Sequence, residues 1–145
     1  MAQTIGRSVG YQVNRDHVLA PAVELIAAAR QEFYRRLREA VDTWEPRPVA
    51  LYVFGSAARE KMHTDSDIDL LVVFPDDVPD EHIENCLTTL SENVERWTGN
   101  EPRPLLLRDS EVVPSGVMDN IAREGRAVVG DPQWLRMRLR ERLGG

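Results

Sequence analysis

Apolar residues recur along this chain with two different spacings, and these predict where its helices and strands lie. Steps of three and four residues predict a long helix from about residue 16 to residue 43, ended by the EPRP segment at 45–48 because proline does not continue a helix. The same spacing predicts a second long helix over residues 79–98, with Gly99 as its left-handed cap. Shorter helices are predicted over residues 115–124 and 132–143.

Short apolar runs mark the predicted strands. The two clearest are VALYVF at 49–54 and DIDLLVVF at 67–74, and weaker strands are predicted over 104–108 and 126–129. Residues 7–13 alternate weakly between polar and apolar side chains, as in a short strand or a loose arm. Strands that alternate with helices predict a two-layer domain made of a sheet and helices.

Length and composition then limit the class of protein. The chain has 145 residues, 42% of them hydrophobic, which is enough to bury about two-thirds of its surface in one domain. It has no apolar run long enough to span a membrane and no apolar signal-peptide core near its N-terminus. The single cysteine, Cys86, excludes an internal disulfide and zinc sites built from several cysteines. These features predict a cytoplasmic protein.

The charges are unevenly distributed around a net charge of −6. Residues 60–101 hold twelve Asp and Glu against Lys61 and Arg96, whereas residues 121–145 hold six Arg against three acidic residues. Two interpretations stay open: these are solvated surfaces, or an acidic site that binds a cation lies beside a basic tail that binds an anion.

The most informative residues are two aspartates in the second clear strand. Because side chains alternate along a strand, Asp67 and Asp69 share one face, while Ile68, Leu70, Val72 and Phe74 take the other face and supply the core. Two carboxylates placed in this way suit one hard divalent cation such as Mg²⁺. The alternative is a pair of solvated carboxylates at the mouth of a strand.

A second feature is the Gly55-Ser56 pair, which lies between an apolar strand and a predicted short helix. The N-terminus of a helix offers unpaired N–H groups to a phosphate, glycine lets the backbone approach it, and the Ser56 hydroxyl can donate to it. The alternative is an ordinary turn in which Ser56 caps the helix.

Together these residues form the pattern G-S-x10-D-x-D, with an apolar strand before each half. An EF-hand is excluded because Leu70 and Asp76 occupy the positions that need Gly and Glu, and no Walker A loop occurs in the chain. The pattern predicts a phosphate-binding turn and metal ligands that face one cleft.

The segments FGSAAR and SDIDLLV, at this spacing, resemble the minimal nucleotidyltransferases of the DNA polymerase β-type superfamily. The resemblance implies an α+β fold, with a mixed sheet flanked by helices, and transfer of a nucleotidyl group from an NTP, usually ATP. It implies that Gly55 and Ser56 hold the triphosphate and that Asp67 and Asp69 hold Mg²⁺ or Mn²⁺. It also implies that Ser66 belongs to the nucleotide site and that Arg59 lies near the phosphates or the acceptor. Metal and positioning supply most of the catalysis in such transfers.

The sequence departs from this family on a later strand. Family members usually carry a third carboxylate there, whereas the expected position in this chain holds Leu105, Leu106 or Leu107. Asp109 is the nearest carboxylate, and it is either the base that activates an acceptor hydroxyl or the cap of a turn.

Small members of this family often act as antitoxins that adenylylate a toxin, so the resemblance implies a HEPN-type toxin protein as partner. Two alternatives stay open: a small-molecule nucleotidyltransferase of the antibiotic-modifying kind, and a nucleotide-binding or regulatory module that lacks the third carboxylate. Neither a membrane nor a nucleic acid is predicted as a partner.

We expect one domain over residues 1–145, with an N-terminal arm at 1–15, a core over about 16–131 and a C-terminal helix at 132–145. The arm is faintly similar to the last strand of a winged-helix module. This similarity would fit a chain that is a piece of a longer regulator.

Overall fold

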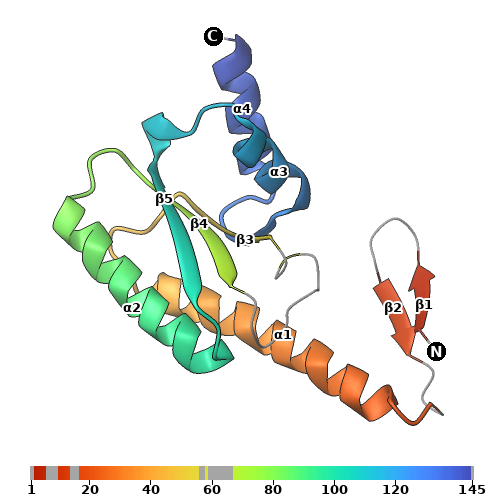
Figure 1. The fold of residues 1–145 in the computed structure, drawn as a ribbon. Helices are drawn as coiled ribbons and strands as arrows, with labels where there is room; N and C mark the ends of the chain where they lie inside the picture. The colour runs from red at the N-terminus through yellow and green to blue at the C-terminus, as the bar shows by residue number, and fades with distance from the viewer. Residues whose placement is uncertain (1, 6–9, 14–16, 56–57, 59–66, 145) are drawn as a thin grey trace. The chain divides into compact units, whose positions relative to one another are not determined.

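The computed structural model describes residues 2–5, 10–13, 17–55, 58 and 67–144 (Figure 1). Their contacts group the chain into two compact units, Met1–Arg36 and Leu37–Gly145. The division falls inside a helix and not at the end of the predicted arm. The prediction of one domain over residues 1–145 stays a prediction.

The first unit contains a two-stranded antiparallel ribbon and the larger part of a helix. Strand β1 (Ala2–Ile5), which the sequence pattern did not predict, pairs with β2 (Gly10–Val13), which lies within the predicted segment 7–13. Helix α1 (Ala20–Asp42) confirms the first long helix. Of its apolar stripe, Leu25 and Ile26 are exposed, while Phe33 is buried.

The second unit is built on a four-stranded sheet in the order β5–β4–β3–β6. Its strands are β3 (Ala50–Phe54), β4 (Ile68–Phe74), β5 (Pro102–Arg108) and β6 (Arg126–Val129). Strands β4 and β5 are parallel, joined through helix α2 (Asp80–Thr98), and the other neighbours are antiparallel. All four predicted strands are present, and the mixed sheet confirms the expected α+β fold class.

Helices cover both faces of this sheet (Figure 1). On one face, Tyr52, Leu71 and Val73 pack with helices α3 (Gly116–Glu124) and α4 (Trp134–Gly144). On the other face lies α2, whose His82 ring meets Phe74 edge-on. The buried residues of α2 are Ile83, Cys86, Leu90 and Val94. The unit therefore has three layers, not the predicted two.

The reason for this difference lies in β4. The sequence analysis assigned the core to one face of this strand, but Leu71 and Val73 on the opposite face are fully buried as well. A strand that is apolar on both sides must be covered on both sides, as parallel strands joined by a crossover helix usually are.

Helix α2 ends where its sequence predicts. Gly99 has φ +73°, and its N–H donates to the carbonyl of Glu95 at 2.8 Å, so it forms the expected left-handed cap. The end of α2 determines where β5 begins, and so which residue of β5 lies beside the start of β4. No helix in the described part of the chain combines the length and hydrophobicity needed to cross a membrane.

Candidate functional site

The pairing of β3 with β4 brings the two halves of the sequence motif together. Phe54 lies opposite Asp69 in the antiparallel register, and Gly55 follows with φ +72°. A Cβ atom on Gly55 would lie 2.4 Å from Oδ2 of Asp69, a distance at which one of the two must move. Only glycine fits this position, because it tolerates the positive φ and leaves room for the carboxylate.

The two aspartates lie at the start of β4. Asp67 directly precedes the strand and Asp69 is its second residue, so both lie on the face that is covered by α3 and α4. Burial raises the pKa of Asp69 above its ordinary value, Arg103 opposes this increase, and the nearby charge of Asp67 adds to it. The carboxylates therefore repel each other in a partly desolvated place, an arrangement that favours a cation.

A positively charged side chain, Arg103 of the neighbouring strand β5, lies beside these carboxylates. Arg103 lies level with Asp69 in the parallel register, and its Nη1 donates to Oδ2 of Asp67 at 3.0 Å. The three leucines at 105–107, which the sequence analysis placed here, lie level with residues 71–73 instead. Strand β5 starts at Pro102, earlier than predicted, and this brings Arg103 into the ladder.

Asp109 lies at the opposite end of the sheet. It follows Arg108, which is level with Phe74, so about 20 Å of strand separates it from Asp69. Its Oδ2 forms an ion pair with Nη2 of Arg138 on α4, at 2.9 Å. The structure therefore does not bring Asp109 to the cleft of Asp67 and Asp69, and its place at the start of a 3₁₀ turn agrees with the structural alternative.

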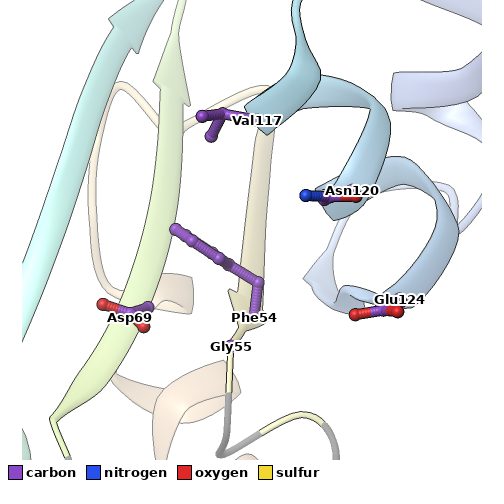
Figure 2. A pocket seen from close by; sticks show the side chains of 6 residues that line it. All are labelled: Phe54, Gly55, Asp69, Val117, Asn120 and Glu124. Atoms are coloured by element: carbon purple, nitrogen blue, oxygen red, sulfur yellow. The ribbon is translucent and has the colours of Figure 1, made fainter.

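An open pocket of about 260 Å³ adjoins the aspartates. Figure 2 shows Phe54, Gly55 and Asp69 on its sheet side and Val117, Asn120 and Glu124 along α3 on the other. These last three residues are spaced by three and four positions, so they share one face of the helix. The side-chain carbonyl of Asn120 accepts from Arg123 at 2.6 Å, which leaves its amide hydrogens as donors.

Three residues of the predicted site, Ser56, Arg59 and Ser66, lie outside the described residues. Among the described ones, no group of three or more His, Cys, Asp or Glu side chains is arranged to hold a metal ion. The donors that the structure does bring together, Asp67 and Asp69, are all oxygen and fit a hard cation that takes its remaining ligands from elsewhere.

The model of the nucleotidyltransferase domain family matches residues 34–109, more than half of the chain. The chain belongs to this family. The matched region contains Gly55, Asp67, Asp69 and Arg103, and it ends at Asp109. Among curated protein sequences, the comparison found no match.

Solved structures of toxin–antitoxin pairs share the fold of this nucleotidyltransferase domain. One contains a toxin–antitoxin with AMP-PNP, at 17% identity and a TM-score of 0.55, with 77% of this chain and 84% of that chain covered. Another is the toxin–antitoxin MntA–HepT, at 16% identity and a TM-score of 0.51, with 79% and 84% covered. A third is tri-AMPylated HEPN toxin of Shewanella oneidensis in complex with MNT antitoxin. Its identity is 16% and its TM-score 0.52, with 79% of this chain and 84% of that chain covered.

Sequence reasoning missed two parts of this candidate site. Arg103 could have been found by letting β5 start directly after the Gly99 cap, which aligns the starts of the two parallel strands. The α3 wall carries a weaker signal, the spacing of Val117, Asn120 and Glu124 on one helix face. No local pattern indicates that this face lies opposite Asp69.

Proposed function

We propose that this nucleotidyltransferase moves AMP from ATP, with Mg²⁺ or Mn²⁺, to a hydroxyl group of a partner protein, and that the partner is a HEPN-type toxin. The close approach of Gly55 to Asp69 carries the site part of this proposal, because it joins the phosphate-binding turn to the metal-binding carboxylates. The toxin part is supported by the toxin–antitoxin structures that share the fold. A cytoplasmic location stays part of the proposal.

Each residue of the motif has a role in this proposal. The backbone at Gly55 and the hydroxyl of Ser56 bind the triphosphate, and Arg59 and Ser66 lie along it. Asp67 and Asp69 hold the cation, which when bound offsets the negative charge of the triphosphate and of the leaving pyrophosphate. Asp109 has no part in the reaction.

The pocket beside Asp69 suits the nucleoside part of the substrate. Phe54 and Val117 offer apolar contacts, and Asn120 and Glu124 offer a donor and an acceptor along one edge. A volume of about 260 Å³ suits the nucleoside alone, so in this proposal the triphosphate extends past Gly55 along the end of the sheet.

The test is transfer of label to protein. The purified chain is incubated with Mg²⁺, a candidate HEPN-type toxin, and ATP labelled at either the α- or the γ-phosphate. The proposal expects label on the toxin from α-labelled ATP only, because γ-label leaves with pyrophosphate. Label from γ-labelled ATP would instead indicate phosphorylation. In a second incubation, with a cell lysate in place of the toxin, label on a small molecule would support the antibiotic-type alternative.

A matched pair of variants shows whether this site is responsible. Asp67→Asn with Asp69→Asn removes two carboxylates from the cleft and is expected to abolish transfer. Asp77→Asn with Glu92→Gln removes the same charge from exposed positions and is expected to retain it. Equal activity of the two double variants would reject the proposed site.

One observation favours a second function, a nucleotide-binding module without transfer. On β5, Arg103 stands level with Asp69 in the ladder, and the position expected to carry a third carboxylate holds one of three leucines, 105–107. Binding of ATP without transfer to any acceptor would favour this module.

A further inference from the structure

Arg103 and Asp67 form an ion pair inside the proposed metal site. The Arg103 side chain is 64% exposed and the Asp67 side chain 39% exposed, with 3.0 Å between Nη1 and Oδ2. The pair joins β5 to the start of β4, and the parallel register also places Arg103 beside Asp69. One guanidinium therefore acts on both carboxylates and contacts one of them.

This contact has a direct consequence for cation binding. Arg103 occupies Oδ2 of Asp67 and neutralises part of the charge of this carboxylate, so the guanidinium and a divalent cation compete for Asp67. The arginine also repels any divalent ion bound at Asp69. An exposed ion pair is weak, so a ligand that offers a better partner to either charge can displace it.

We propose that Arg103 is a built-in counterion that keeps free divalent metal out of the site, so that metal and nucleotide enter together. This inference rests on the proposed function, since it assigns Asp67 to the cation that accompanies the nucleotide. A bound triphosphate would break the ion pair, because its oxygens accept hydrogen bonds from the Arg103 guanidinium. Asp67 then becomes available to the divalent cation. Nucleotide and metal then strengthen each other's binding by the same factor.

The experiment measures Mn²⁺ binding to the full chain without nucleotide, from the electron paramagnetic resonance signal of free Mn²⁺. Arg103→Gln is expected to bind Mn²⁺ about three- to tenfold more tightly than the unmodified protein, because it removes both the competitor and the repulsion. Arg103→Glu is expected to bind more tightly still, and Arg103→Lys to stay near the unmodified affinity. Arg96→Gln, on the exposed side of α2, is the matched control and is expected to change nothing.

The second measurement repeats these titrations with saturating ATP, and the Mn²⁺ that ATP binds without protein is measured separately and subtracted. The unmodified protein is expected to gain several-fold in Mn²⁺ affinity from ATP, and Arg103→Gln to gain much less. Adding Asp67→Asn to Arg103→Gln is expected to remove the tighter binding, because the competition acts through Asp67.

Unchanged Mn²⁺ affinity in Arg103→Gln, or no Mn²⁺ binding by any variant, would overturn this inference. Tighter Mn²⁺ binding by Arg103→Gln without label transfer to any acceptor would reject the proposed function and leave the counterion in place. Label transfer with unchanged Mn²⁺ affinity would do the reverse.

Discussion

The two ends of the sheet each combine carboxylates with arginine, but they use them differently. At the far end, where β4 and β5 finish, Arg108 donates to the carbonyls of Asp76 and Val78 at 2.9 and 2.8 Å. It also pairs with Asp80. Asp109 pairs there with Arg138 of α4. At the near end, where β4 begins, Asp67 and Asp69 lie on one face, and Arg103, level with Asp69, contacts Asp67.

This difference separates structure from function in residues of the same type. At the far end, an oxygen of Asp76 accepts from the backbone N–H of Ser110 at 2.9 Å, and backbone carbonyls accept from Arg108, so the charges connect loops to the sheet. At the near end, burial and like charge raise the pKa of Asp69, so the arrangement is unfavourable until a cation arrives. The comparison predicts that changes at the far end alter stability and changes at the near end alter activity.

The largest effect is expected at Gly55. Gly55→Ala places a Cβ against Asp69 and should reduce transfer by about 100-fold or more, because displaced catalytic groups lose rate steeply. Gly99→Ala is the matched control, since Gly99 has nearly the same φ but open space around its Cβ position. It should lower the free energy of unfolding by about 1–2 kcal/mol and leave transfer unchanged. Equal transfer activity of Gly55→Ala and Gly99→Ala would contradict the prediction that the near end determines activity.

The next effect tests the far end. Arg108→Met leaves several backbone carbonyls without their donor and should lower the free energy of unfolding in urea by about 2–4 kcal/mol. Below its unfolding transition, the variant should transfer nucleotide normally. Arg96→Met, in an exposed position, should change stability by less than about 0.5 kcal/mol. Loss of transfer by folded Arg108→Met would show that the two ends are coupled.

A smaller effect is expected at Asp109. Asp109→Ala removes one of the two acidic partners of the partly buried Arg138, the other being Glu141, and should reduce stability by about 1–2 kcal/mol. The label-transfer rate should match that of the unmodified protein, since about 20 Å separates Asp109 from Asp69. A folded variant without transfer would restore Asp109 as a catalytic base.

The smallest effect is the pH dependence of stability at Asp69. Because its pKa is raised in the folded protein, the ionised form destabilises the fold, and this penalty is present at neutral pH and disappears as the pH falls below about 4. Asp69→Asn should therefore raise the unfolding temperature at pH 7 by about 1–3 °C and not at pH 3.5. Asp77→Asn, at an exposed position, is the control. A lower unfolding temperature of Asp69→Asn at pH 7 would contradict the conclusion that ionised Asp69 destabilises the fold.

Much of the fold, and the common face of Asp67 and Asp69, followed from the sequence because they depend on local rules. Alternation along β4 places Asp67 and Asp69 on one side whatever the strand packs against. The predicted cap at Gly99 depends only on residues of its own helix. The four strands of the sheet were predicted from their own apolar runs.

The rest was decided by tertiary structure. Which residue of β5 lies beside Asp69 depends on the length and packing of α2, and this brought in Arg103 and left Asp109 at the far end. The α3 wall of the pocket depends on how that helix covers the sheet, which no spacing within α3 encodes. The sequence by itself determined which side chains share a strand face, because that repeat is local. Only the tertiary structure determined which charges meet, because contacts between distant segments arise from packing.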